Sequence, residues 1–293
     1  MVSIQRPRRS VLYMPGSNAR ALEKGRTLVA DALILDLEDA VSTANKVEAR
    51  GLIIEALNQG GYGNREIIVR VNSLDTIWGV DDVEAIANTS ADAILLPKVE
   101  TAEQVQNLID LMDRSGAPEA MSVMCMMETP LGMLNAKEIA ASSKRISCFV
   151  MGTSDLVKDL HASHTKLRLP VITSLGLCLL AARAYDIAIV DGVCLDLSDD
   201  EGFEKSCAQG LELGFDGKTL IHPKTILTAN KVFGPSSLAV EKAHSIVRAF
   251  EEADSKGQGV VVLNGQLIEN LHAEEARRLI ALADIISDLE RDN

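Results

Sequence analysis

Short apolar runs recur along the chain, and each of them ends in polar or charged residues. The runs are four to seven residues long, rich in Ile, Val, Leu or Met and without polar alternation, which is typical of parallel strands buried on both faces. They lie within residues 10–16, 31–39, 66–72, 92–98, 122–129, 147–155, 187–193 and 217–223. Segments with helical spacing, such as 102–114 and 175–185, separate them. This alternation predicts an α/β fold, a (β/α)8 TIM barrel, with a doubly wound open sheet as the alternative.

The last part of the chain has a different pattern. Residues 236–257 have helical spacing, and two short extended pieces within residues 260–268 flank Asn264-Gly265, a strong hairpin signal. We therefore expect residues 1–232 to form the barrel as a catalytic domain. Residues 235–293 are expected to form a C-terminal helical segment with a short hairpin, which acts as a lid.

Composition and charge narrow the possible partners. Hydrophobic residues make up 47% of the 293 residues but aromatic ones only 3%, so the core must be aliphatic. No apolar stretch approaches the roughly 20 residues of a membrane span, and the start MVSIQRPRRS lacks the apolar segment of a signal peptide, so a cytoplasmic protein is expected. The formal net charge of -13 argues against a nucleic-acid partner. The cysteines lack metal-ligand or redox spacing and are expected to be reduced structural thiols.

The ends of the expected strands carry an unusual number of polar side chains. In chain order these are Asp36, Glu38, Asp39, Arg70, Asn72, Lys98, Glu128, Asp155, Asp191, Lys218 and His222. Active sites of barrels of this kind are built where the strands end, at their C-terminal tips. The pattern therefore predicts one mouth lined with charges of both signs.

Glu128 and Asp155 end consecutive strands, so their carboxylates are expected to converge. Two oxygen ligands with room for water and substrate suit Mg²⁺, which rarely has a full protein cage. An N-cap of the next helix is the alternative for Asp155 alone. Arg70 can hold a carboxylate through two parallel hydrogen bonds. A structural ion pair of Arg70 with Glu38 or Asp39 is the alternative, and the two roles are compatible.

The first strand leads into PGSNARALEKGR (residues 15–26), where a Gly-Ser-Asn turn opens a helix that carries Arg20, Lys24 and Arg26. Backbone N–H groups at a helix start, together with nearby cations, form an anion site that can take phosphates. Ordinary helix capping and a solvated basic face are the alternative.

Seven motifs resemble, in their order and spacing, the CitE-like group of the HpcH/HpaI aldolase superfamily. They are RSVLYMPGSNARALEK, LILDLEDAV, IVRVN, LLPKVE, METPLGMLN, MGTSDL and LGFDGKTLIHPKTI, and they span essentially the whole chain. The group contains citrate lyase β subunits, malyl-CoA lyases and citramalyl-CoA lyases. The resemblance implies a Mg²⁺-dependent TIM barrel that acts on 3-hydroxyacyl-CoA thioesters, assembled as a homotrimer or hexamer.

The resemblance also implies roles for single residues. Glu128 and Asp155 would be the metal ligands, and Arg70 would hold the substrate carboxylate as a catalytic and substrate-binding residue. Glu38 and Asp39 are expected beside the substrate, where they help to orient Arg70 and metal-bound water. The phosphates and adenine of CoA are expected near Tyr13, Asn18 and Lys24.

One position departs from the group's pattern. Its lyases carry an Asp in a C-terminal segment that reaches a neighbouring subunit's active site as an acid or base, and in NGQLIENLHAEEA (residues 264–276) Glu269 stands in its place. The segment resembles most the (3S)-malyl-CoA thioesterase branch, whose members hydrolyse the thioester instead of breaking a carbon–carbon bond. Glu269 is therefore expected to position or deprotonate a water. The alternative is that Glu269 merely starts the last helix, where the helix dipole favours a carboxylate.

The expected function is thus hydrolysis of (3S)-malyl-CoA to malate and CoA. Cleavage of malyl-CoA or citramalyl-CoA in a retro-Claisen sense is the first alternative. A non-catalytic subunit and an aldolase acting on free oxo acids without CoA are the others.

Overall fold

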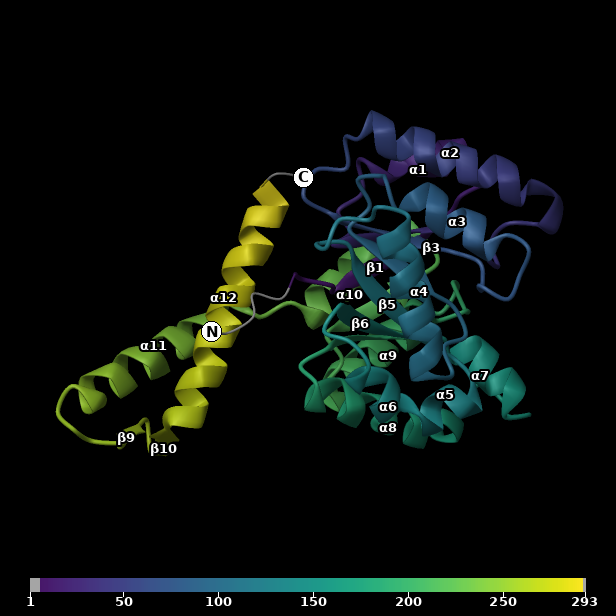
Figure 1. Ribbon diagram of the computed structural model, residues 1–293. Helices are drawn as coiled ribbons and strands as arrows, with labels where there is room; N and C mark the ends of the chain where they lie inside the picture. The colour runs from purple at the N-terminus through teal and green to yellow at the C-terminus, as the bar shows by residue number, and fades with distance from the viewer. Residues whose placement is uncertain (1–5, 292–293) are drawn as a thin grey trace. The chain divides into compact units, whose positions relative to one another are not determined.

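The computed structural model describes residues 6–291. It divides into two compact units, residues 8–233 and the residues from Gly234 onward (Figure 1). Each unit has a hydrophobic core of its own.

Residues 8–233 form a closed barrel of eight parallel strands. The strands are β1 (Ser10–Pro15), β2 (Ala32–Asp36), β3 (Glu66–Arg70), β4 (Ala93–Leu96), β5 (Ser122–Met127), β6 (Ile146–Met151), β7 (Ala188–Asp191) and β8 (Gly217–Leu220). Each strand pairs with the next along the chain, and β8 returns to pair with β1. The barrel predicted from the alternating pattern is confirmed, and the open sheet is wrong.

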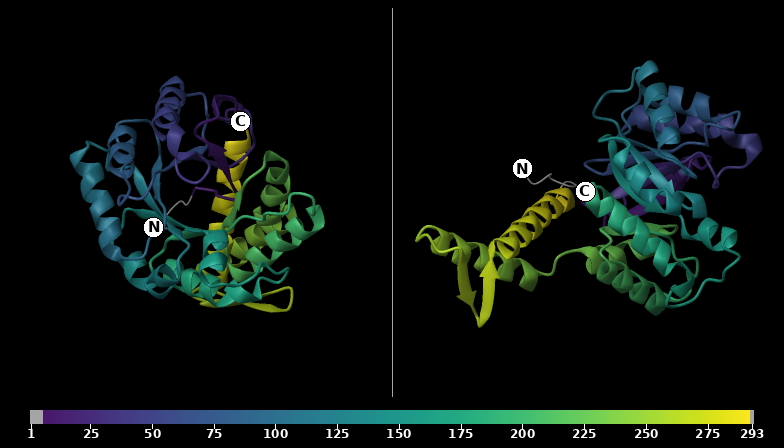
Figure 2. Two further views of the ribbon diagram at one scale, coloured as in Figure 1. Left: turned by 90° about the vertical axis from the view of Figure 1, so that its right-hand side faces the viewer. Right: turned by 60° about the horizontal axis from the view of Figure 1, so that its bottom comes forward.

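Helices surround the strands (Figure 2). They are α1 (Ala19–Gly25), α2 (Lys46–Gln59), α3 (Gly79–Ile86), α4 (Ala102–Arg114), α5 (Pro130–Leu134), α6 (Ala136–Ala141), α7 (Thr153–Asp159), α8 (Ile172–Ala184), α9 (Asp200–Leu213) and α10 (Ile226–Phe233), with short 3₁₀ turns η1 (Thr43–Asn45), η2 (Leu169–Val171) and η3 (Pro223–Thr225). The start of helix α4 is fixed by side-chain hydrogen bonds. The Thr101 side chain accepts from Gln104 N–H while the Gln104 side chain accepts from Thr101 N–H, a capping box at the helix start.

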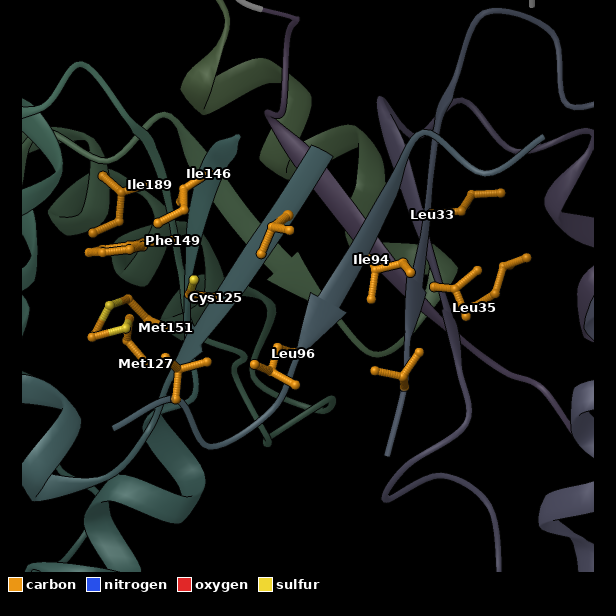
Figure 3. Close-up of a cluster of buried hydrophobic side chains, with 14 of the residues drawn as sticks. Leu33, Leu35, Ile94, Leu96, Cys125, Met127, Ile146, Phe149, Met151 and Ile189 are labelled. Carbon is orange, nitrogen blue, oxygen red and sulfur yellow. The ribbon is translucent and has the colours of Figure 1, made fainter. Parts of the chain in front are cut away.

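The aliphatic side chains of the strands form two layers, as their lack of polar alternation requires. Alternate residues such as Ile34, Ile68 and Met124 point inward and fill the barrel. The residues between them, among them Leu33 and Phe149, pack outward against the helices (Figure 3). This division leaves the interior apolar up to the strand ends, where polar side chains take over.

Two ion pairs brace the opposite end of the barrel, where the strands begin. Arg8 donates from Nε and Nη2 to Glu66 at 2.6 and 2.7 Å, and Arg9 donates from Nε and Nη2 to Asp31 at 2.9 and 2.8 Å. All four side chains are buried. Their fork geometry ties the chain before β1 to the starts of β2 and β3.

The second unit contains α11 (Ser237–Asp254), β9 (Val260–Leu263), β10 (Gln266–Glu269) and α12 (Asn270–Arg291). The two helices lie side by side, and the antiparallel hairpin β9–β10 packs beside them (Figure 1). Asn264 and Gly265 both have positive φ, 49° and 80°, as a two-residue type I′ turn needs. The helix and hairpin therefore stand where the sequence pattern indicated.

None of the helices in residues 6–291 combines the length and apolar character that crossing a bilayer requires.

Candidate active site

The C-terminal ends of β2, β3 and β5 carry a group of polar side chains that are largely removed from water. Asp36, Glu38, Arg70, Asn72 and Glu128 are each at most 8% exposed. Since the same strands are apolar inside the barrel, these charges gather at one mouth, as the sequence predicted.

Arg70, the last residue of β3, is the centre of this group. Its Nε and Nη2 donate to the two carboxylate oxygens of Asp36 at 2.7 and 2.5 Å. Its guanidinium lies over the ring of Tyr13, 5.0 Å from the ring centre, as in a cation–π contact. Burial works against the charge, but the hydrogen bonds to Asp36 and the surrounding carboxylates hold the pKa of Arg70 above its usual value.

The ion-pair alternative for Arg70 is also present in the structure. Nη1 lies 2.8 Å from Glu38 Oε2, a charge contact without hydrogen-bond geometry, and 3.5 Å from Asp39 Oδ2. The strongest partner, however, is Asp36, which sequence reasoning placed at a strand end without a role. The signal was available, because Asp36 and Arg70 end neighbouring strands and pair in register.

Lys46, 6% exposed and also without an assigned role, fixes the loop that carries Glu38 and Asp39. Its Nζ donates to the carbonyl oxygens of Leu37 and Glu38, each at 2.7 Å. Asn72 Nδ2 donates to the same Leu37 carbonyl at 3.0 Å. The loop after β2 is therefore held from two sides, which restricts where Glu38 can point.

Glu128 follows β5 and is 1% exposed. Its Oε1 accepts a hydrogen bond from Lys98 N–H at 2.8 Å, whereas Oε2 has no hydrogen-bond donor among residues 6–291. Oε2 lies against Gly152, where a Cβ would approach it to 2.4 Å. Burial raises the pKa of Glu128 to about 8, and the Glu38 and Asp155 charges also act to raise it.

Asp155 lies three residues beyond Gly152, in the first turn of α7, with 28% of its side chain exposed. The N-cap of α7 is Gly152, so the interpretation of Asp155 as an N-cap is wrong and its carboxylate is not used in capping. Its charge is among those that act to raise the pKa of Glu128. Glu128 and Asp155 follow the neighbouring strands β5 and β6, and their convergence on one metal ion stays a prediction.

A magnesium ion fits these residues. Glu128 is a buried carboxylate with one oxygen left without a donor, and a cation beside Asp155 would balance its charge. No group of three or more His, Cys, Asp or Glu side chains within residues 6–291 forms a metal cluster. An ion held by Glu128 and Asp155 would complete its shell with water and substrate oxygens, as Mg²⁺ commonly does.

The residues expected around CoA separate into two places. Asn18 caps α1 by accepting from Ala21 N–H at 3.1 Å, and Lys24 is exposed on the same helix. Tyr13 instead points into the barrel, with its hydroxyl 3.9 Å from Met126 Sδ and its ring under Arg70. Tyr13 therefore contacts the group of polar side chains around Arg70, and the expected shared site of these three residues for CoA stays a prediction.

Glu269 is the last residue of β10 in the second unit, directly before α12. It pairs with Val260, and this face of the hairpin also carries the paired residues Val262 and Leu267, all three of them exposed. The opposite face packs into the unit through Ile268. His272 Nδ1 accepts from Glu269 N–H at 3.0 Å, a bond that uses the backbone of Glu269 and not its carboxylate.

A closed parallel barrel with acidic side chains and an arginine at the C-terminal ends of its strands has the architecture of the TIM-barrel enzymes, whose active sites lie at those ends. Residues 9–223 match the family model described as HpcH/HpaI aldolase/citrate lyase, and the chain belongs to this family.

Three relatives show how far the similarity extends. A (3S)-malyl-CoA thioesterase of Cereibacter sphaeroides is 51% identical over 96% of both chains. A citrate lyase β subunit of Leuconostoc mesenteroides is 36% identical and covers 96% of this chain and 94% of its own. CitE from Mycobacterium tuberculosis, solved with magnesium, acetoacetate and coenzyme A, has a TM-score of 0.75 and 28% identity, with 96% of this chain and 98% of CitE covered.

Proposed function

We propose that this protein hydrolyses (3S)-malyl-CoA to malate and CoA in a Mg²⁺-dependent reaction. The observation that carries the proposal is the buried Glu128 carboxylate, which lacks a donor for Oε2 and stands beside Asp155 and the Arg70 cluster. The similarity to a malyl-CoA thioesterase over nearly the full length of both chains selects the substrate. The solved relative with bound magnesium and CoA supports the metal and the thioester.

Each residue of the site has its own role in this reaction. Glu128 and Asp155 would hold Mg²⁺, which when bound supplies Lewis acidity toward the malyl carboxylate and hydroxyl. Arg70 contributes positive charge, and Asp36 keeps its guanidinium in place. Glu269 takes a proton from water as the water oxygen attacks the thioester carbonyl carbon. The carbon–sulfur bond then breaks, and the departing sulfur takes up the proton to give malate and free CoA.

Carbon–carbon cleavage is the second candidate, favoured by the similarity to citrate lyase β subunits. In that reaction the base takes the proton of the malyl hydroxyl, the bond breaks to give glyoxylate, and the acetyl-CoA enolate is protonated. One product analysis distinguishes the two. Malyl-CoA incubated with the protein and Mg²⁺ should give malate and free CoA. Glyoxylate with acetyl-CoA would establish cleavage, and no turnover with or without Mg²⁺ would refute both.

We further propose that the second unit is a lid that brings Glu269 to the barrel mouth of a neighbouring subunit in a homotrimer or hexamer. The support is the exposed apolar face around Glu269, formed by Val260, Val262 and Leu267, which calls for a covering surface. Mixed oligomers of Glu269→Ala and Glu128→Gln chains should regain activity, because some sites would combine an intact lid with an intact metal pair. Mixtures as inactive as the separate variants would contradict a shared site.

The remaining proposals concern CoA and the compartment. We propose that the CoA phosphates bind near Asn18, which caps the start of α1, and Lys24, an exposed cation in the last turn of that helix. Lys24→Glu should then raise the KM for malyl-CoA without a change in kcat. We place the enzyme in the cytoplasm, which fits its five free thiols.

A further inference from the structure

Lys98, at the turn after β4, has an uncommon backbone conformation. Its φ is 51°, in the left-handed region that side chains with a Cβ adopt at an energetic cost. The two residues after Lys98 are held by hydrogen bonds. Val99 N–H donates to Met126 O at 3.2 Å, and Asn135 Nδ2 donates to Glu100 O at 2.8 Å. The chain therefore keeps Lys98 in this conformation although other residues would adopt it more easily.

In this conformation the backbone N–H of Lys98 points toward the carboxylate of Glu128 and donates a hydrogen bond to it. The donor lies 2.8 Å from Oε1, and Oε2 is turned toward Gly152, at the start of the helix that carries Asp155. The side chain acts in the same direction. Lys98 Nζ lies 2.5 Å from Glu38 Oε1, an ion pair that helps to offset the left-handed backbone.

On the basis of the proposed function, we propose that Lys98 is a positioning residue that fixes Glu128 Oε1 through its left-handed N–H and so leaves Oε2 for the metal. Without this donor the carboxylate would turn within its pocket, and the cation would lose a preset ligand. The role belongs to the backbone of residue 98, and the ammonium stabilises the conformation that presents it.

The chain offers a matched pair of variants. Lys98→Gly and Lys98→Ala both remove the ammonium and its contact with Glu38, but only glycine adopts positive φ without a steric cost. The alanine variant should therefore let the turn relax and lose the donor to Glu128. We expect Mg²⁺, titrated calorimetrically into the full-length protein, to bind Lys98→Ala roughly five- to thirtyfold more weakly than Lys98→Gly, the equivalent of one left-handed residue. In Lys98→Gly, kcat should also be less reduced than in Lys98→Ala.

Thermal unfolding in EDTA separates this role from a structural one. Lower stability of Lys98→Ala together with equal Mg²⁺ affinities of the two variants would overturn the inference while leaving the proposed function intact. A wild-type protein that binds no Mg²⁺ would overturn both. A wild-type protein that binds Mg²⁺ with the expected difference between the variants, yet does not hydrolyse malyl-CoA, would leave the inference standing and refute the function.

Discussion

Replacing Glu128 by glutamine should stabilise the metal-free protein while removing its response to Mg²⁺. The side chain is 1% exposed, and burial raises its pKa from 4.5 to about 8. Each unit of difference between the pKa values of the folded and unfolded states corresponds to about 1.4 kcal/mol. The ionised carboxylate therefore destabilises the metal-free fold by about 5 kcal/mol at pH 8. The glutamine amide will lack a full set of partners, at a cost of roughly 1–3 kcal/mol. A net gain of about 2–4 kcal/mol is expected.

The difference in the free energy of unfolding between the wild type and Glu128→Gln should depend on pH. Between about pH 4.5 and 8 the unfolded chain has lost the Glu128 proton while the folded barrel keeps it. The free energy of unfolding of the wild type should therefore fall relative to Glu128→Gln across this window and level off above it.

Thermal unfolding of both proteins in EDTA, followed by circular dichroism at pH 5 and pH 8, measures the difference. At pH 8 the variant should melt roughly 5–15 °C higher. At pH 5 the charge penalty is only about 0.7 kcal/mol and the cost of the amide remains, so the variant should melt at the same temperature as the wild type or a few degrees lower. Adding Mg²⁺ at pH 8 should raise the melting temperature of the wild type alone. An equal difference at both pH values, or an equal response to Mg²⁺ in both proteins, would refute the reasoning.

Three further substitutions test the rest of the site. Gly152→Ala places a Cβ 2.4 Å from Glu128 Oε2 and should weaken Mg²⁺ binding at least about tenfold, measured by calorimetry, while Gly176→Ala, with no atom within 4 Å, should leave it unchanged. Arg70→Lys keeps the charge but cannot pair with both oxygens of Asp36, so kcat/KM for malyl-CoA should fall about a hundredfold in steady-state assays. Glu269→Ala should lower kcat by about 10²–10⁴ with little change in KM, and an unchanged kcat would leave it no role in proton transfer.

Sequence pattern predicted the barrel because most strands are built around an aliphatic run and the strands alternate with helices, so local composition and fold agree. The prediction that Glu128 and Asp155 converge rests on the order of the strands, because β5 and β6 are neighbours in the barrel. The partners of Arg70 were harder to rank, since Asp36, Glu38 and Asp39 lie in one short segment. Which of them faces the guanidinium depends on strand register and on loop contacts from Lys46, which is distant from Arg70 in sequence.

The conformation of Lys98 could not be read from the sequence at all. LLPKVE contains no glycine, the usual sign of a left-handed turn, and the lysine side chain suggested a charge at the mouth rather than a backbone donor. The inward position of Tyr13 was missed for a related reason, because its neighbours on β1 in sequence include the turn that leads to Asn18, whereas its spatial neighbours come from β3 and β5.

The ion pair between Lys98 and Glu38 affects the reactivity of the lysine amine at the mouth of the barrel. A thioester acylates any unprotonated amine held close to it, and Lys98 Nζ is half-exposed at the place proposed for the substrate. Although burial acts to lower it, the hydrogen bond and charge of Glu38 raise the pKa of Lys98 to about 12, so at pH 7 only about one molecule in 10⁵ carries the free amine. Relative to an ordinary lysine, the carboxylate thereby makes acylation of Lys98 by a thioester bound at the mouth less frequent.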